Sequence, residues 1–394
     1  MDSLISPAEA DEIIAASLQA LPAEPVYFLD ALARTLRETL CADRDFPPFD
    51  RVTMDGIACR SLDLTLPALT LQGLHPAGDP APAALLPGHC WQVMTGAVLP
   101  SDCDTIVPVE ELHLREKRVS LRKDAEPQAG QFIHRQGSDC VAGCELLQAG
   151  TTIAPAHLGL AATIGKTELL VTRQPRITLL TTGDELIPPS EKPAPHQLRQ
   201  SNGPVLLGAL QAFTRDCQHL HLSDDLGATR LALEEAIAAS DLVLLSGGIS
   251  KGKKDYVRPA LQELVGPPAF HGIAQRPGKP LAYWSPRSES PPIFALPGNP
   301  NSTLTTFLRY VRPALSLLAG SLPAQGPLLP LREPLTPHDR LTLFLPASIQ
   351  PDGRLLVIKP QNSGDFASTL NASGFVEVPP GPDLIQQALY HANF

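Results

Sequence analysis

Between positions 176 and 318 the sequence alternates short apolar segments with amphipathic ones, and this alternation restricts the possible fold more than any other feature. Apolar runs predict strands over 177–180, 219–222, 241–245 and 293–296, and periodic apolar positions predict helices over 201–213, 228–239, 255–264 and 301–318. Consecutive strands that are joined through a helix run parallel in one sheet. The chain is therefore expected to contain a doubly wound, mostly parallel α/β sheet.

The segments on either side of this region follow other patterns. Ser6, Pro7 and Glu9 match a capping box that starts a helix, and apolar residues at fourfold spacing predict a second helix over 26–40. Short apolar runs between Pro and Gly predict strands over 68–74, 90–94 and 104–109, and after Gly320 over 341–345, 354–358 and 374–378. These patterns predict a small β domain before the α/β region and another after it. A chain of 394 residues is long enough for two to four domains.

Charge and hydropathy exclude several classes of partner. The formal net charge of −10 argues against nucleic acid and anionic membranes, because both bind basic surfaces. The sequence has no apolar run long enough to span a bilayer and no signal-peptide pattern at its start, so we expect a cytoplasmic protein. The seven cysteines are irregularly spaced, with Cys140 and Cys144 the nearest pair. A metal or redox role for that pair is one interpretation, but reduced, partly buried thiols are favoured.

Four turns that follow predicted strands contain the residues best suited to chemistry, since ligands of open parallel sheets bind at the carboxyl ends of the strands. They are Thr181-Thr182-Gly183-Asp184-Glu185, Ser223-Asp224-Asp225, Ser246-Gly247-Gly248-Ile249-Ser250-Lys251-Gly252 with Asp255 beyond it, and Pro297-Gly298-Asn299-Pro300-Asn301-Ser302. The glycine-rich turn exposes consecutive backbone amides, which suits a phosphate or another tetrahedral oxyanion. A purely structural tight turn is the alternative.

Carboxylates in these turns are candidate metal ligands. They are Asp184, Glu185, Asp224, Asp225 and Asp255. Carboxylates that gather at one sheet edge repel one another, and a hard cation such as Mg²⁺ relieves the repulsion. Taken singly, each acid could instead cap a helix or lie in a solvated turn.

A further turn, Arg276-Pro277-Gly278-Lys279-Pro280, places two cations just before a predicted strand over 281–284. Fixed cations can hold an oxyanion at little ordering cost. A basic hairpin turn is the alternative interpretation.

Taken together, the motifs of the chain resemble those of the molybdopterin molybdenumtransferase family, the MoeA and gephyrin E-domain group. The supporting motifs are Phe49-Asp50-Arg51-Val52-Thr53-Met54-Asp55-Gly56, Met94-Thr95-Gly96-Ala97, Arg135-Gln136-Gly137-Ser138-Asp139, Thr182-Gly183-Asp184-Glu185-Leu186, Ser201-Asn202, Ser246-Gly247-Gly248-Ile249-Ser250, Pro277-Gly278-Lys279-Pro280 and Leu296-Pro297-Gly298-Asn299-Pro300. They occur in the family's order.

The resemblance implies four domains in an elongated homodimer, with an active site shared between subunits. The implied domains are an N-terminal helical and linking domain (1–45 and 142–172), a small β domain (46–141) that contributes to the partner subunit's site, an α/β molybdopterin-binding domain (173–319) and a C-terminal β domain (320–394). The implied reaction joins molybdate to adenylylated molybdopterin with Mg²⁺ and releases AMP.

The resemblance also implies roles for individual residues. The implied catalytic residues are Asp55, Thr95, Asp139, Glu185 and Asp255. The implied substrate-binding residues are Thr182, Gly183, Ser246, Gly247, Gly248, Ser250, Pro297 and Pro300, with Lys279, Ser302, Arg340 and Ser363 forming a molybdate pocket. Gly272 and Arg276 depart from the pattern, since many family members have lysines there.

Three alternatives remain open at this stage. A molybdopterin adenylyltransferase shares the Thr-Gly-Asp-Glu and Ser-Gly-Gly turns, but the β regions around the sheet favour the molybdenumtransferase. A scaffold that has lost catalysis would not need the acidic turns or Lys279. A generic Mg²⁺ phosphotransferase is the third. Sequence alone does not separate molybdate from tungstate, nor Asp224 from Asp225 as the metal ligand.

Overall fold

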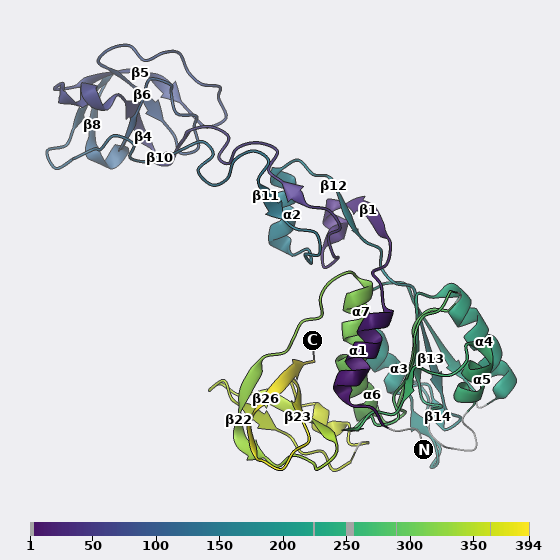
Figure 1. Ribbon diagram of the computed structural model, residues 1–394. Helices are drawn as coiled ribbons and strands as arrows, with labels where there is room; N and C mark the ends of the chain where they lie inside the picture. Colours follow the sequence, from purple (N-terminus) through teal and green to yellow (C-terminus); the bar gives the residue numbers. More distant parts are fainter. Residues whose placement is uncertain (1–3, 224, 250–255, 289, 363, 394) are drawn as a thin grey trace. The chain divides into compact units, whose positions relative to one another are not determined.

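A computed structural model describes residues 4–223, 225–249, 256–288, 290–362 and 364–393 of the chain (Figure 1). Met1–Arg37, Gly150–Ala154 and Glu168–Phe394 form one compact unit, and Glu38–Ala149 with Pro155–Thr167 form a second. We call these unit 1 and unit 2. Within the described ranges, no helix is both long and apolar enough to cross a membrane.

The main sheet of unit 1 has six strands in the order β16-β13-β17-β21-β20-β18. They are β13 Ile177–Thr182, β16 Cys217–Leu222, β17 Leu242–Ser246, β18 Phe270–His271, β20 Ala282–Trp284 and β21 Ile293–Leu296. The first four in this spatial order are parallel, and β20 and β18 complete the sheet as antiparallel strands. The predicted mostly parallel α/β sheet is confirmed, and all five strands expected in it are present.

Different helices cover the two faces of this sheet, because successive residues of a strand point to opposite faces. Leu242 and Leu244 pack with α1 Pro7–Ser17, α3 Asn202–Leu210 and the C-terminal helical segment, which runs as α6 Pro300–Thr306, a π-helical turn Phe307–Val311 and α7 Arg312–Leu318. Val243 and Leu245 pack instead with α4 Leu226–Ala239 and α5 Val257–Leu264. The strands are therefore apolar at every position, which is why no alternation shows in their sequences.

The N-terminal helix starts as its sequence predicts. The Ser6 hydroxyl accepts a hydrogen bond from the Glu9 backbone N–H at 3.2 Å, and the Glu9 carboxylate accepts one from the Ser6 N–H at 2.7 Å. Two otherwise unpaired donors are thus satisfied at the helix start.

The helix predicted over 26–40 is wrong. Residues there form strand β1 Ala23–Tyr27, a 3-10 turn Phe28–Ala31 and the short strand β2 Leu40–Cys41. β1 pairs antiparallel with β12 Glu168–Thr172, and Leu32, which should face the core in a helix, is 49% exposed. The pairing with a strand 140 residues away overrides a weak local periodicity, and Ala33 in the left-handed region (φ 63°) interrupts any helix.

The C-terminal part of unit 1 is a β barrel. It consists of β22 Leu328–Leu335, β23 Thr342–Ile349, β24 Leu355–Val357, β25 Gly374–Val378 and β26 Ile385–Ala392, and the pairing of β23 with β25 closes the ring. A 3-10 turn, Ala367–Thr369, lies between β24 and β25. The short strand β19 Gln275–Arg276 adds to β23, so the segment that precedes Lys279 belongs to the barrel sheet and not to a basic hairpin. All three predicted strands are present.

Unit 2 contains a six-stranded sheet in the order β7-β4-β6-β5-β9-β8. Its strands are β4 Gly56–Cys59, β5 Leu69–His75, β6 His89–Val93, β7 Thr105–Pro108, β8 Leu112–Arg115 and β9 Arg118–Leu121, with 3-10 turns at Ser61–Thr65 and Val109–Glu111. The strands predicted over 68–74, 90–94 and 104–109 are therefore present. Outside this sheet lie α2 Pro155–Thr163 and the pairs β3 Arg51–Val52 with β10 Ile133–His134 and β2 with β11 Glu145–Leu147.

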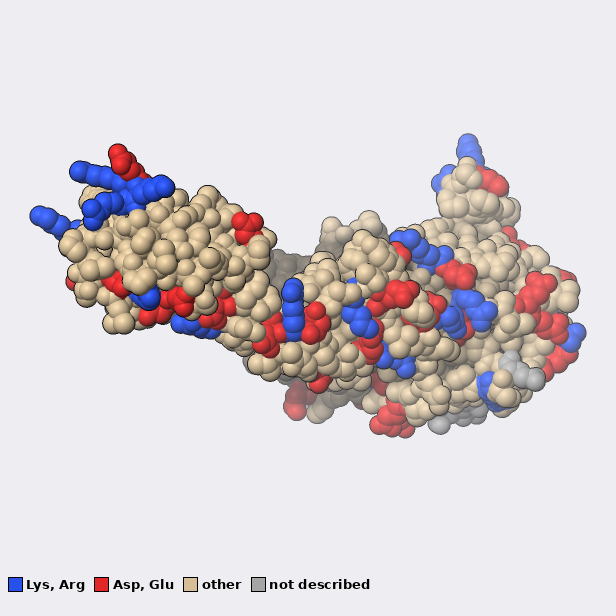
Figure 2. Space-filling view, turned by 90° about the horizontal axis from the view of Figure 1, so that it is seen from above, with Lys and Arg blue, Asp and Glu red and all other residues tan. Residues whose placement is uncertain are grey.

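Charge is unevenly distributed on unit 2. Figure 2 shows Lys and Arg side chains gathered at the end of the β domain that Figure 1 labels β8. The hairpin β8–β9 has exposed Arg115, Lys117 and Arg118, with exposed Glu116 at its tip. A small basic patch of this kind, mixed with acid, does not change the inference from net charge that nucleic acid is an unsuitable partner.

Candidate active site

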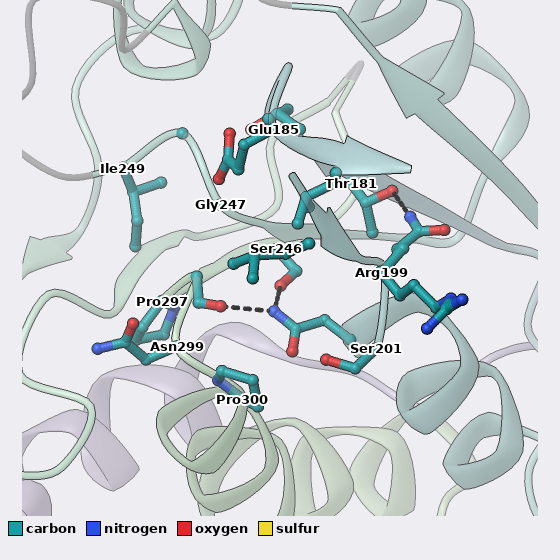
Figure 3. Close-up of a pocket in the computed structure, with 18 of the residues that line it drawn as sticks. Thr181, Glu185, Arg199, Ser201, Ser246, Gly247, Ile249, Pro297, Asn299 and Pro300 are labelled. Carbon is teal, nitrogen blue, oxygen red and sulfur yellow. Dashed lines mark hydrogen bonds between the residues drawn. The ribbon is translucent and has the colours of Figure 1, made fainter. Parts of the chain in front are cut away.

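A cavity of about 420 Å³ opens at the carboxyl ends of β13, β17 and β21 (Figure 3). This volume falls in the range of small-molecule sites. Its lining comes from the segments after these strands and before α3, and consists of Thr181, Thr182, Gly183, Glu185, Leu186, Leu198, Arg199, Gln200, Ser201, Asn202, Ser246, Gly247, Gly248, Ile249, Pro280, Pro297, Gly298, Asn299 and Pro300. Three of the four predicted turns thus meet at one sheet edge, as parallel strand topology requires.

The Ser246-Gly247-Gly248 turn forms the floor of this cavity with its backbone. Gly247 and Gly248 both have positive φ angles, 95° and 70°. A Cβ on Gly247 would lie 3.0 Å from the Thr182 carbonyl oxygen, and one on Gly248 would lie 2.6 Å from Cγ2 of Val257. Glycine is required here both by backbone conformation and by close packing, which leaves the amides of the turn uncovered by side chains.

Glu185 lies over the first turn, at the rim of the same cavity. Gly183 has φ 135°, and a Cβ at that position would approach the Glu185 carboxylate to 2.9 Å. Figure 3 shows this carboxylate above Gly247. A carboxylate and a turn with exposed amides therefore face one space, which is an arrangement that can hold a cation together with an anion.

Asn202 joins two of the turns, and the sequence did not identify it as a site residue. Its side-chain nitrogen donates hydrogen bonds to the Ser246 hydroxyl at 2.9 Å and to the Gly298 carbonyl at 2.7 Å (Figure 3). The residue is 8% exposed, so both acceptors depend on it. The Ser201-Asn202 motif was noticed, but its position before a helix gave no sign that the side chain reaches the opposite turn.

Hydrogen bonds around Thr181 organise another wall of the cavity. The Thr181 hydroxyl accepts from the Gln200 amide at 2.5 Å and lies 3.1 Å from His219 Nε2 and 3.0 Å from His221 Nδ1. Burial and the neighbouring His221 lower the pKa of His219. One hydroxyl can donate a single proton, so this arrangement suits neutral imidazoles, one of which accepts that proton.

Unit 2 brings two predicted catalytic residues together on its surface. The Asp55 carboxylate accepts hydrogen bonds from the Thr95 backbone N–H and from the Thr95 hydroxyl, both at 2.7 Å. These two bonds lower the pKa of Asp55. Asp139 interacts with a different residue, since its Oδ1 lies 2.8 Å from His134 Nε2, whose other ring nitrogen lies 3.2 Å from the Arg51 guanidinium. Asp55 and Asp139 are therefore both held in place as exposed carboxylates.

Comparisons with known proteins decide the family. The description "MoeA N-terminal region (domain I and II)" matches residues 5–165, and "Probable molybdopterin binding domain" matches residues 178–317. The molybdopterin molybdenumtransferase of a Synechocystis species is 33% identical over 95% of this chain and 96% of its own. The chain belongs to the molybdopterin molybdenumtransferase family. Its activity is that of a transferase in molybdenum cofactor biosynthesis.

Two other relatives agree with this assignment over nearly the whole chain. The molybdopterin molybdenumtransferase of Synechococcus elongatus is 32% identical and covers 97% of each chain. A crystal structure titled as the molybdopterin biosynthesis MoeA protein of Pyrococcus horikosii superimposes with a TM-score of 0.81 at 26% identity, and covers 100% of both chains. The fold of the molybdenumtransferases therefore extends from the first described helix to the C-terminal barrel.

The predicted metal ligands of this molybdenumtransferase are only partly in view. Asp224 and Asp255 lie outside the described residues, as do Ser250 and Ser363 among the substrate-binding residues. Asp225 caps α4, because its Oδ1 accepts from the Ala228 N–H at 2.8 Å, and Asp184 is exposed but absent from the cavity lining. Within the described ranges no three His, Cys, Asp or Glu side chains gather as a metal site. Glu185, the carboxylate at the cavity, supplies the oxygen chemistry that Mg²⁺ prefers.

The residues assigned to the molybdate pocket are spread more widely than those of the cavity. Pro297 and Pro300 line the cavity, whereas Lys279 and Arg340 are exposed and do not. Ser302 is 4% exposed inside α6. Gly272 departs from the family pattern for a local reason, since its φ is 98° and a Cβ there would meet Leu4 at 2.8 Å.

Proposed function

We propose that this molybdenumtransferase joins molybdate to adenylylated molybdopterin and releases AMP in a Mg²⁺-dependent reaction. One observation carries the proposal: the Thr182-Gly183, Ser246-Gly247-Gly248 and Pro297-Gly298-Asn299-Pro300 turns line a single cavity at the carboxyl ends of parallel strands. A cavity of about 420 Å³ accommodates the phosphate-bearing part of a dinucleotide-sized ligand. The release of AMP breaks a phosphoanhydride bond, so charge on phosphate oxygens must be stabilised.

The residues around the cavity can divide this task. Backbone amides of the Gly247-Gly248 turn would bind phosphate oxygens directly, and Asn202 would hold that turn against Gly298. Mg²⁺ would supply charge neutralisation at the pyrophosphate, with Glu185 as its described ligand and Asp184, Asp224, Asp225 and Asp255 as the further candidates. Lys279, Ser302, Arg340 and Ser363 are proposed to bind molybdate, because a tetrahedral dianion needs positive charge and directed donors.

We also propose a homodimer in which Asp55, Thr95 and Asp139 act in the cavity of the partner subunit. The support is that Asp55 and Thr95 are hydrogen-bonded to one another on an exposed surface of unit 2, where a carboxylate with a lowered pKa has no cavity of its own within its described surroundings. Such an arrangement is typical of a site completed by a second chain.

The reaction is tested by mixing the purified protein with adenylylated molybdopterin, molybdate and Mg²⁺ and following AMP release. We expect AMP to form with all three present and not when Mg²⁺ is removed by a chelator. Absence of AMP at every molybdate concentration would exclude the proposed reaction. Conversion of free molybdopterin and ATP would instead identify an adenylyltransferase.

The shared site is tested by mixing two inactive variants, Asp55→Ala and Gly248→Ala. If each site takes residues from both chains, a mixed dimer has one intact site, so random exchange restores up to about a quarter of the normal rate. If each site lies within one chain, the mixture stays as inactive as the separate variants. The oligomeric state of each variant, measured by light scattering, serves as the control.

A further inference from the structure

Cys140 and Cys144 lie at the two ends of a tight turn in unit 2, and the proposed reaction uses neither. The Phe46 N–H donates to the Cys140 carbonyl at 2.8 Å, and the Cys140 N–H donates to the Phe46 carbonyl at 3.2 Å. Beyond this bridge the chain reverses, with the Cys144 N–H donating to the Val141 carbonyl at 3.1 Å. Both thiols are partly exposed, and the thiol of Cys140 is hydrogen-bonded to that of Cys144.

The turn between the two thiols is fixed from the opposite strand. The Asp45 carboxylate accepts from the Ala142 N–H at 2.8 Å, and the Ala42 carbonyl accepts from the Gly143 N–H at 2.8 Å. Gly143 has φ 80°, which lets the chain reverse between the cysteines. Since the backbone is already ordered, bringing the sulfurs to bonding distance, about 2.05 Å, requires mainly side-chain rotation.

The other cysteines lack this combination of access and proximity. Cys59, Cys90 and Cys103 are buried, and burial raises the pKa of each thiol. Cys217 is half-buried in β16, where burial raises its pKa to about 11. Cys41 is exposed, but in the ladder between β2 and β11 it is paired with Glu145. Access decides which thiols react and proximity decides which can bond to each other, so the pair at 140 and 144 differs from the rest.

We infer that Cys140 and Cys144 form a dithiol that low-molecular-weight disulfides oxidise reversibly to an intramolecular disulfide. One thiol loses its proton and attacks a sulfur of the external disulfide, which forms a mixed disulfide and releases one external thiol. The second protein thiol then attacks the bonded cysteine sulfur, closes the ring and releases the second external thiol. Two protein thiols are oxidised while one external disulfide is reduced to two thiols, and an excess of external thiol reverses the exchange.

The site adjoins a residue of the proposed reaction. Asp139 precedes Cys140, and the N–H groups of both donate to the same Phe46 carbonyl, at 2.9 and 3.2 Å. A disulfide that pulls on Cys140 therefore acts on the backbone that positions the Asp139 carboxylate. This regulatory consequence rests on the proposed function, whereas the disulfide itself does not.

The disulfide is tested on the full chain equilibrated with oxidised glutathione, alkylated with iodoacetamide and digested with trypsin without reductant. Cleavage after Arg135 and Lys166 releases both cysteines in one peptide, 136–166, which contains no other cysteine. We expect most of this peptide to lose two hydrogen atoms and to take up no alkylating reagent, and prior treatment with dithiothreitol to restore double alkylation. A doubly alkylated peptide, or one that carries glutathione without an internal bond, would overturn the inference.

Other cysteines of the chain supply the controls. Cys41→Ser should leave the disulfide intact, while Cys144→Ser should yield only a mixed disulfide at Cys140; if Cys144→Ser does not fold, the peptide from the unaltered chain still decides. Buried Cys90 and Cys103 should remain unmodified in the folded protein. For the link to Asp139, AMP release by the oxidised protein should fall several-fold and recover with dithiothreitol, and unchanged release by a protein proven to contain the disulfide would refute that link alone.

Discussion

At the scale of single residues, the two glycines after β17 combine a conformational requirement with a spatial one. Gly248→Ala must adopt φ 70° and place a methyl group 2.6 Å from Val257 Cγ2, so either the turn or α5 has to move. We expect the variant to fold but to lose most of its affinity for AMP, because the amides of the turn no longer point into the cavity. Isothermal titration with AMP measures this loss.

Gly353 provides a matched control for that variant. It has a similar φ, 78°, but a Cβ there would have nothing within 4 Å. Gly353→Ala should therefore cost only the backbone strain, about 1–2 kcal/mol in the free energy of unfolding, and leave AMP binding unchanged. Equal losses of affinity in the two variants would show that the close approach at Gly248 has no functional importance.

Asp241 makes a residue-scale prediction about pH. Burial alone would raise the pKa of Asp241, but hydrogen bonds from Arg173 (2.7 and 2.9 Å) and Arg176 outweigh it and hold the pKa well below its usual range. The unfolded chain therefore binds the proton more readily, so the stabilisation is complete above about pH 4 and is lost as the pH falls below that value. Asp241→Asn should lower the free energy of unfolding by about 1.5–3 kcal/mol at pH 7.

Fluorescence of Trp284 reports this unfolding, because Trp284 is 3% exposed in the same sheet. A background of Trp91→Phe removes the only other tryptophan, which lies in unit 2. Urea titrations of both proteins at pH 7 and pH 3 should converge at the lower pH. A difference between them that does not shrink with acid would rule out the ion pair as its source.

At the scale of elements, the sequence predicts best where local signals and tertiary packing agree. The strands and helices from 177 to 318 are found close to their predicted bounds, because each strand is apolar throughout and each helix has a buried face. The region 26–40 fails for the opposite reason, since its three apolar residues fit a helix but its backbone pairs with β12. Pairing between distant strands is not encoded in a local window.

The same distinction explains the site. Thr182, Gly183, Ser246, Gly247, Gly248, Pro297 and Pro300 could be predicted to meet because topology alone places the ends of parallel strands at one edge. Gln200 and Asn202 could not, because they precede α3 and reach the cavity only through side-chain hydrogen bonds to Thr181 and Ser246. Asp225 shows the limit of reasoning from residue type, since its carboxylate caps a helix.

A buried ionic network makes the prediction at this scale, since it joins α1, the π-helical turn and β25. Arg309 is bonded to Asp11 at 2.7 and 2.9 Å and to Glu377 at 2.9 Å, and His391 Nε2 lies 2.9 Å from the same Glu377 carboxylate. Burial alone would lower the pKa of Arg309, but its bonds to Asp11 and the charge of Glu377 raise it, so the guanidinium stays charged. Glu377→Gln should therefore destabilise unit 1 by roughly 1.5–3 kcal/mol, the range for a hydrogen bond to a charged group.

Calorimetry and proteolysis measure where that destabilisation acts. The network attaches the barrel to the α/β sheet, so Glu377→Gln should separate the unfolding of the barrel from that of the sheet and expose the segment before β22 to protease. The double variant Asp11→Asn with Glu377→Gln should be less stable than either single variant by a non-additive amount. Additive losses would mean that the three side chains do not act as one network.

At the scale of the whole molecule, the chain of unit 2 is inserted between two paired strands of unit 1. β1 and β12 are antiparallel neighbours with Tyr27 opposite Glu168, and nearly all of the intervening 140 residues belong to unit 2. An insertion between adjacent strand ends interrupts neither the main sheet nor the barrel. This explains how one chain can present a cavity on unit 1 and a separate set of exposed carboxylates on unit 2.

The β domain should therefore be removable without loss of the cavity. In the ladder between β2 and β11, Cys41 lies opposite Glu145, so replacing residues 42–144 by Asn-Gly closes a two-residue hairpin turn. The shortened protein should keep its Trp284 fluorescence and its affinity for AMP, because every residue that lines the cavity remains. It should have no turnover, since Asp55, Thr95 and Asp139 are absent, and it should regain turnover when mixed with Gly248→Ala, whose β domain is intact. Turnover by the shortened protein alone would mean that the chemistry needs nothing from unit 2, whereas AMP binding without rescue would place the catalytic carboxylates in the same chain as the cavity they serve.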